Sequence, residues 1–374
     1  MDVQKHLHIL KNKEIDELYI NIGLRSFALA LVSVFIPIFL LDLGFNLIDI
    51  FMVYLLLSVF HILFTFVSSY LSSKVGFKHT MILSQPFLIA FFIILFSLDA
   101  YHLPLILLSL SYGIFSGLFW PAFHGDFAKF SDIGSKGSQV AFGNIIASLL
   151  SIMAPIIGGV IVAFFSFQYV FLFAIALLIV SVIPLFLTKD NKEPVSFSIK
   201  NIFKYKSLKH TFGYLGYGFS ARGFGVVWPI FLFVSILNES YIELGLLTAF
   251  LFFFSFISTI IIGKKFDKHN KNFIEAILGF SGFIWLFKLF VVFPIFAYLA
   301  DLLHGLTKPA HEITVDGVTY ENAMPNIVDY IIYRELFIHL GIILYLAVLI
   351  FVPSLMLGLF LASIGSFMMI LLQK

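Results

Sequence analysis

The sequence predicts an all-α polytopic membrane protein with about twelve transmembrane helices in two pseudo-symmetric six-helix bundles. Hydrophobic residues make up 60% of the chain and charged residues only 12%, whereas a soluble domain is about one quarter charged. Because a soluble fold needs charge to cover its surface, this composition excludes a soluble enzyme, a nucleic-acid-binding domain and a disordered protein. The apolar residues form continuous runs of about twenty residues, the length of a membrane-spanning helix. They lack the alternation of barrel strands, so we expect helices.

Six apolar runs precede a polar segment and six follow it. The first run is too long for a signal peptide and has no small-residue cleavage site, so we interpret it as a retained span. The polar segment, residues 188–209, predicts a central cytoplasmic loop between an N-terminal bundle of residues 1–187 and a C-terminal bundle of residues 210–374. The predicted spans are residues 18–41, 48–71, 80–98, 103–123, 140–165, 169–187, 211–237, 241–262, 273–287, 289–309, 328–352 and 353–372.

The loop lysines predict the orientation. If the spans alternate, nearly all lysine clusters fall on one side of the membrane, and the opposite side carries acids such as Asp42 and Asp99 with only Lys288. Outside the N-terminal tail and the central loop, the clustered lysines are Lys74, Lys78, Lys129, Lys136, Lys264, Lys265, Lys268 and Lys271. By the positive-inside rule this side is cytoplasmic. We therefore expect a multi-pass protein of the cytoplasmic (inner) membrane with both termini inside the cell.

The two halves of the chain share an internal repeat. The run that begins Pro37-Ile-Phe-Leu recurs as Pro229-Ile-Phe-Leu, and Gly117-Leu-x-x-Pro121-Ala recurs as Gly305-Leu-x-x-Pro309-Ala. Because six spans return the chain to its starting side, the halves are parallel repeats. Such a duplication predicts a binding site between the halves, near the middle of the membrane.

A loop motif connects this plan to a known family. The loop after the eighth span reads Gly263-Lys-Lys-Phe-Asp267-Lys268-His-Asn270-Lys271. It is similar to the cytoplasmic signature of the major facilitator superfamily, Gly-x-x-x-Asp-(Arg/Lys)-x-Gly-(Arg/Lys). The first copy, Ser69-x-x-x-Ser73-Lys74-x-Gly76-Phe-Lys78, departs from the signature where serine replaces glycine and aspartate. With the twelve-span plan and the duplication, the resemblance covers essentially the whole chain.

The resemblance implies a monomeric secondary transporter that exposes a central site to each side of the membrane in turn. We expect Asp267 to help close the cytoplasmic side, because a carboxylate at a helix end can meet a helix N-terminus or a basic side chain of the other half. At the equivalent position, Ser73 offers only a weaker neutral hydrogen bond.

The fifth span contains Ala154-Pro155-Ile-Ile-Gly158-Gly159. This resembles the end of an element in the fifth helix of antiporter branches of the superfamily. Proline and glycine also bend a helix and let a neighbour pack closely, and we favour this packing role. The fourth span lacks the arginine of proton-coupled drug antiporters, a departure that weighs against drug efflux.

All three arginines, Arg25, Arg222 and Arg334, lie within predicted spans. Charge at this depth is costly and usually faces a cavity or a partner. Arg25 and Arg222 occur in the first and seventh spans, which line the central cavity in the superfamily. We predict that they bind substrate, because two guanidinium groups can hold a phosphate or carboxylate in a bidentate manner. The alternative for Arg25 is a structural ion pair with Glu17.

Asp301 is the deepest acid, and His304 shares its helix face at the i+3 position. We predict that this pair carries the coupling proton; the alternative is that Asp301 neutralises an arginine structurally. His61 and His339 are interpreted as isolated core histidines. Arg334 and Glu335 are adjacent and are expected to find partners elsewhere rather than each other.

These observations predict proton-coupled transport, as a symporter or antiporter, of a small organic solute with a preference for anions. Efflux of amphipathic compounds or lipids is the alternative within transport, and a non-transporting sensor or assembly protein is the alternative of another class. The chain has no Walker loop, no His-Glu-x-x-His, no Gly-x-Ser-x-Gly and no cysteine. We therefore expect no enzymatic activity, cofactor, metal or nucleic-acid partner. The expected partners are the solute, protons and the lipid bilayer.

Overall fold

The computed structural model describes residues 13–131, 136–187, 207–323 and 327–373. Nearly all of these residues are helical, and they form the twelve expected spans in the expected order. Within the described residues, nine helices are both long and apolar enough to cross a membrane. The first twelve residues and most of the predicted central loop lie outside the described residues.

The N-terminal half contains the first six spans. They are α2 (Lys13–Ala30) with α3 (Ile36–Asp42), α4 (Leu47–Val75), α5 (Phe77–Tyr101), α6 (Ile106–Phe130), α7 (Lys136–Ser151) with α8 (Ala154–Phe164), and α9 (Phe167–Val182) with η1 (Ile183–Phe186). The C-terminal half contains α11 (Leu208–Arg222), η3 (Gly223–Val227) and α12 (Trp228–Ser235) as one span, followed by α13 (Tyr241–Asp267), α14 (Lys271–Lys288), α15 (Pro294–Asn322), α16 (Ile327–Phe351), and α17 (Leu355–Met368) with η4 (Met369–Gln373).

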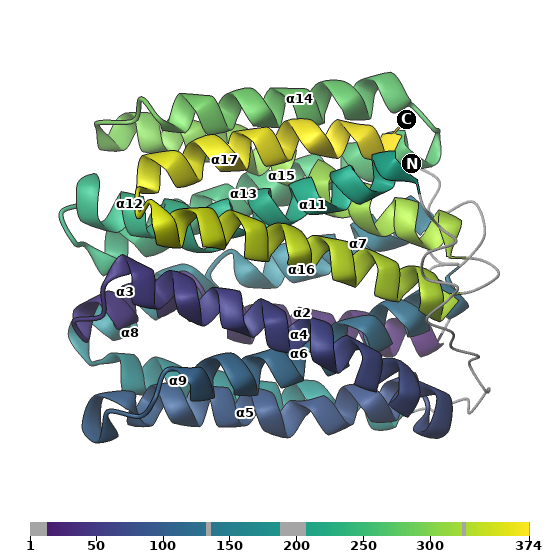
Figure 1. The fold of residues 1–374 in the computed structure, drawn as a ribbon, viewed down its shortest axis with the longest axis horizontal. Helices are drawn as coiled ribbons and strands as arrows, with labels where there is room; N and C mark the ends of the chain where they lie inside the picture. The colour runs from purple at the N-terminus through teal and green to yellow at the C-terminus, as the bar shows by residue number, and fades with distance from the viewer. Residues whose placement is uncertain (1–12, 132–135, 188–206, 324–326, 374) are drawn as a thin grey trace.

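The helices of the two halves form two groups (Figure 1), with α3 to α6 and α9 on one side and α11 to α17 on the other. The halves meet along two seams. The helix α4 packs against α16, and the two parts of the fifth span, α7 and α8, pack against α13. We call the end of the bundle that carries Lys74 and Lys264 the lysine-rich end, and the other the opposite end.

Local sequence explains where several helices begin. Asn46 and Asp49 form a capping box at the start of α4, with both side chain to backbone distances at 3.1 Å. At the repeat-related start of α13, the Ser240 hydroxyl accepts a hydrogen bond from the backbone N–H of Glu243. Between α4 and α5 the chain reverses at Gly76, whose φ of 97° is rarely adopted by other residues.

Three spans expected to be continuous are interrupted just before a proline. The first span breaks before Pro37, the fifth breaks before Pro155, and the seventh contains the π-helical turn η3 before Pro229. Proline lacks the backbone N–H and its ring clashes with the carbonyl one turn earlier, which favours an interruption at these positions, although α5, α6 and α15 each continue through an internal proline. The interruptions lie at the repeat-related prolines of the first and seventh spans, and thus recur in both halves.

The fourth and tenth spans extend furthest past their predicted ends. The fourth continues past residue 123 to Phe130, and the tenth continues past residue 309 to Asn322. Both extensions carry polar side chains that face the protein interior, including His124, Asp126 and Asp316, and a hydropathy pattern ends where such residues begin. The prediction was wrong here because these groups are buried by protein rather than exposed in a loop.

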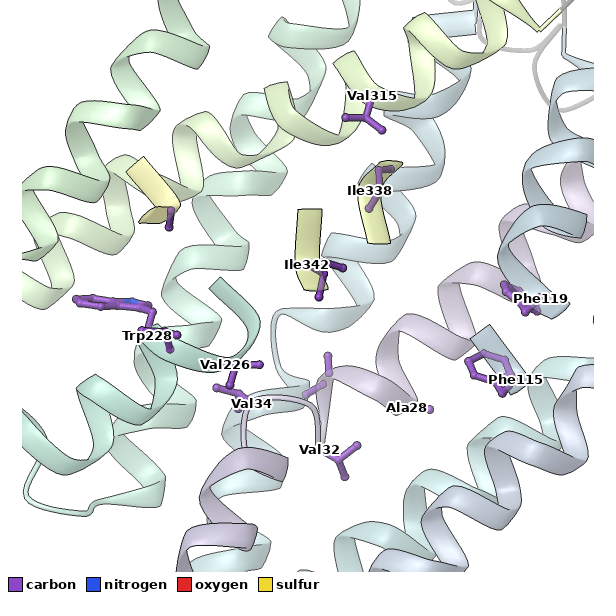
Figure 2. Close-up of a cluster of buried hydrophobic side chains, with 14 of the residues drawn as sticks. Ala28, Val32, Val34, Phe115, Phe119, Val226, Trp228, Val315, Ile338 and Ile342 are labelled. Carbon is purple, nitrogen blue, oxygen red and sulfur yellow. The ribbon is translucent and has the colours of Figure 1, made fainter. Parts of the chain in front are cut away.

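Buried apolar side chains come from both halves (Figure 2). Ala28, Phe115 and Phe119 belong to the N-terminal half, and Val226 and Ile338 to the C-terminal half. The outer surface also carries large apolar side chains, among them Phe351, which is 86% exposed. An apolar exterior of this kind suits lipid rather than water.

The seam between α8 and α13 depends on glycine. A Cβ at Gly159 would lie 2.5 Å from the carbonyl oxygen of Tyr241, and one at Gly245 would lie 2.3 Å from that of Pro155. Small residues are what allow helix backbones to approach this closely in a membrane.

We therefore predict that Gly159→Ala destabilises the protein by about 1–3 kcal/mol through overpacking. Gly279→Ala is the matched control, because the nearest atom to its added Cβ is a side-chain carbon 3.6 Å away. Thermal unfolding followed by intrinsic fluorescence in detergent compares the two. Equal unfolding midpoints for the two variants would show that the close approach of α8 and α13 is not required.

Candidate functional site

A cavity of about 500 Å³ lies between the halves. Its wall is formed by α2, α4, α6 and α7 of the N-terminal half and by α11, α13, α15 and α16 of the C-terminal half. A volume of this size fits a small solute. The cavity occupies the position that the duplicated sequence predicts for a binding site.

The acids that line the cavity are all paired with bases. Arg334 forms ion pairs with Asp316, at 2.6 Å, and with the neighbouring Glu335. Lys308 pairs with Glu312 one turn further along α15. The expectation that Arg334 and Glu335 would not contact each other was therefore wrong, although each also has a partner on another helix.

Arg25 lines the cavity and is fully buried, at 0% exposure. Its guanidinium carbon lies 3.6 Å from the ring centre of Phe119, and Nη2 donates a long hydrogen bond of 3.4 Å to Gln85. Nε and Nη1 have no hydrogen-bond partner among the described residues. The proposed ion pair with Glu17 is not formed, because Glu17 lies 2.9 Å from Lys78 instead.

Arg222 lines the same cavity as the last residue of α11, directly before the π-helical turn. Its guanidinium carbon lies 5.1 Å from the ring centre of Tyr54, and within the described part of the chain it has no carboxylate in ion-pair range. Its Nε is buried without a hydrogen-bond partner. Arg25, Tyr112 and Arg222 line the same cavity, so the two arginines share one wall. The structure thus places two cations that lack an anion among the described residues, Arg25 fully buried and Arg222 half-buried, in the wall of one cavity.

The structure also joins residues that the sequence left apart. The rings of His61, on α4, and His339, on α16, stack with centres 3.5 Å apart and planes 14° apart. Nε2 of His61 lies 3.1 Å and Nε2 of His339 lies 4.0 Å from the same carboxylate oxygen of Glu335. The interpretation of the two histidines as isolated core residues was wrong. The available signal was that each is a titratable residue within a membrane span.

Further polar contacts join the halves beside this cluster. His124, on α6, lies 2.6 Å from the hydroxyl of Tyr320, on α15, and 3.9 Å from Glu335. His124 lines the cavity wall and is buried.

Asp301 and His304 lie in a different environment. Both contact the Lys288 ammonium group, at 2.9 Å each, and Asp301 also accepts a hydrogen bond from the Trp228 indole at 2.9 Å. Lys288 is 0% exposed, so its placement in a loop was wrong. The whole group lies within the C-terminal half and does not line the cavity. Asp301 neutralises Lys288, whereas the structural alternative for Asp301 expected an arginine as its partner.

The loop motif residues lie at the lysine-rich end. Asp267 accepts hydrogen bonds from the backbone N–H of Ser138, at 2.9 Å, and from its hydroxyl. Ser138 lies in the first turn of α7, so a carboxylate of the C-terminal half contacts a helix N-terminus of the N-terminal half.

The remaining motif residues shape or flank the turns. Asn270 caps α14 through the N–H of Phe273, and Gly263 is buried in the last turns of α13. The side chains of Lys74, Lys268 and Lys271 are exposed.

In the fifth-span element, Pro155 begins α8 and both glycines are packing positions. A Cβ at Gly158 would lie 2.1 Å from the carbonyl of Leu31, at the break in the first span. Gly159 faces α13 across the interface, as described above.

Comparison with known proteins identifies the family. The family model described as the Major Facilitator Superfamily matches residues 18–314. The chain belongs to the major facilitator superfamily. A search of curated proteins returned no match.

Solved structures agree in fold. A variant of the E. coli fucose:proton symporter FucP superimposes with a TM-score of 0.67 at 12% identity, covering 96% of this chain and 97% of FucP. FucP in its outward conformation gives a TM-score of 0.68 at 13% identity over the same shares of both chains. The protein is a secondary transporter with the superfamily fold, and not an enzyme.

Transport by this fold requires each end of the cavity to open in turn. Contacts between the halves at either end must therefore break during transport. Asp267 joins the halves at the lysine-rich end. At the opposite end, the hydroxyl of Tyr241, on α13, donates a hydrogen bond to Asp42, on α3. The two carboxylates thus hold opposite ends of the same interface.

We predict that Asp267→Asn opens the lysine-rich end, because it removes a negative charge from a helix N-terminus. The loss of about 1 kcal/mol would raise the open population roughly fivefold. The chain has no native cysteine, so a single cysteine at Ser148, in the cavity wall, reports accessibility to an impermeant maleimide from each side.

Asp42→Asn is the matched control, since it removes a carboxylate contact at the opposite end. We expect it to speed labelling from that side only. If both variants are labelled at the same rate as the Ser148→Cys protein with both carboxylates intact, neither carboxylate keeps its end of the cavity closed.

Proposed function

We propose that this transporter moves a small organic anion, that it is proton-coupled, and that Arg222 and Arg25 bind the anion. The observation that supports the proposal is how the charged side chains that line the cavity are paired. The three lining acids Glu312, Asp316 and Glu335 are paired with Lys308 and Arg334. Arg25 and Arg222 are left without a carboxylate in the described part of the chain.

A buried guanidinium without an anion is costly, and the cost falls when a ligand supplies the missing charge. The free Nε and Nη1 of Arg25 and the free Nε of Arg222 offer donors of the kind that phosphate and carboxylate groups accept. The break in the first span and the π-helical turn in the seventh interrupt the helices that carry these arginines. Irregular backbone within membrane helices is tolerated where it is covered by protein or lines a cavity.

The proton coupling is supported by the fold and by the titratable groups of the cavity wall. FucP, which shares the fold, is a fucose:proton symporter. We further propose that the protein lies in the cytoplasmic (inner) membrane with its lysine-rich end facing the cytoplasm. We also propose that a single chain is the working unit, since the cavity is lined by one chain.

Efflux of an amphipathic compound is a second candidate, favoured by the aromatic side chains in the same wall. Trp120, Phe123, Phe127 and Phe252 all line the cavity. Such a surface suits the apolar part of a substrate, and the two arginines then select for an acidic group. The two candidates differ in whether transport depends on an anionic charge.

We predict that Arg222→Ala lowers transport of an anionic solute by roughly 10- to 100-fold, because charge-assisted hydrogen bonds contribute about 1.5–3 kcal/mol. The measurement is uptake of radiolabelled lactate, benzoate and glycerol 3-phosphate into proteoliposomes. Lys209→Ala is the control, since it removes a positive charge from an exposed position of the same helix.

Transport of any of these anions that is unchanged in Arg222→Ala would refute the role of Arg222. Transport of a neutral or cationic fluorescent dye, with no uptake of the three anions, would instead favour efflux of amphipathic compounds.

A further inference from the structure

The stacked histidines and Glu335 form a buried group that the anion site does not use. His61 is 1% exposed, and the group joins α4 of one half to α16 of the other. We propose that His61, His339 and Glu335 bind a single proton across the interface between the halves, and that this is the proton coupled to their movement. The inference rests on the proposed proton-coupled function and assigns the proton to a site.

The hydrogen bonds of His61 are arranged so that the ring can gain or lose a proton. Nε2 faces the Glu335 carboxylate at 3.1 Å, and Nδ1 faces the hydroxyl of Ser116 at 3.0 Å. The Ser116 hydroxyl also lies 3.3 Å from the carbonyl oxygen of Gly113. In a neutral ring with its proton on Nε2, Nδ1 accepts a hydrogen bond from Ser116. In the imidazolium, Nδ1–H donates to Ser116, whose own proton then turns to Gly113. Both protonation states are therefore satisfied.

The second histidine limits the site to one proton. Two imidazolium rings stacked at 3.5 Å would repel each other strongly in a buried setting. Among the described residues, Nδ1 of His339 has no hydrogen-bond partner, so this ring lacks a hydroxyl that could reverse its hydrogen bond as Ser116 can. The proton consequently resides on His61, between Ser116 and Glu335.

The surrounding charges make the site sensitive to the state of the cavity. The titratable and charged groups that act on the histidine pair are Glu335, Arg334, His124 and Arg222. Glu335 is the only acid among them, and Arg334 already holds its other oxygen. A proton on His61 therefore creates an ion pair between α4 and α16, which strengthens the contact between the halves. Loss of the proton weakens the same contact.

The same donor atoms do not suit a metal ion. They lie within 4.8 Å of one another, but a metal must lie in the plane of each imidazole that binds it. The two ring planes are nearly parallel and stacked, so they share no such point. Arg334 also holds one of the two carboxylate oxygens of Glu335. The arrangement favours a proton as the ligand.

The Asp301 and His304 pair provides a contrast. Lys288 contacts both side chains, and all three residues belong to the C-terminal half. A proton there would not change any contact between the halves. The location at the interface is what distinguishes the His61 site.

Two measurements on the full-length protein in liposomes test the proposal without any solute, so a failure of the anion assignment does not affect them. The first is nitrogen-15 NMR of labelled histidine between about pH 8 and about pH 5, with the His61 signals identified from the spectrum of His61→Gln. We expect His61 to become an imidazolium and His339 to stay neutral. Glu335→Gln and the milder Ser116→Ala should each lower the imidazolium fraction at a given pH.

The second measurement is the distance between spin labels at Tyr101→Cys and Phe290→Cys, two exposed positions in opposite halves. We expect acid to enrich the arrangement in which α4 contacts α16, and this response to be lost in His61→Gln. The control is His210→Gln, because His210 bonds to Tyr330 outside the cavity wall and should leave the response intact.

Three results would overturn the proposal. One is a His61 ring that stays neutral over the whole range. Another is a distance response that survives in His61→Gln but disappears in His304→Gln or Asp301→Asn. The third is stoichiometric Zn²⁺ binding that is lost in both His61→Gln and His339→Gln, which would assign the group to a metal.

Discussion

The need to pair each charge within a membrane governs this structure. Arg334 satisfies that need for two acids at once, since it holds Asp316 on α15 and Glu335 on its own helix. Because those acids are already paired, neither can neutralise Arg25 or Arg222. The positive character of the cavity thus follows from how Arg334 is placed, and the proposed preference for anions rests on that positive character.

The buried pair in the C-terminal half has a consequence for the cavity. Lys288 and Asp301 neutralise each other, and Asp301 also accepts a hydrogen bond from Trp228. Trp228 directly follows the π-helical turn, and Arg222 directly precedes it. This contact anchors the residue that follows the irregular turn, although the pair itself does not line the cavity.

Sequence predicted the features that depend on local pattern and failed for those that depend on distant partners. Hydropathy predicted the twelve spans, and the rarity of arginine singled out Arg25 and Arg222, which line one cavity. Asp267 meets a helix N-terminus of the other half, the kind of partner expected for it. His61 and His339 are far apart in the chain, however, and periodicity shows the face of a helix but not what lies opposite. Lys288 was placed in a loop for the same reason.

Proton and anion sites that share one wall must influence each other. Arg222 and Arg334 line the same cavity as the histidine pair, so their positive field opposes a further positive charge on these rings. An anion bound to Arg222 would cancel part of that positive field and make a proton on His61 less costly. Linkage requires the converse, so a proton on His61 favours the anion by the same factor. The two ligands would then move together, and the ion pair between His61 and Glu335 would form when both are present. One arrangement of charges would thus account for solute binding and for contact between the halves.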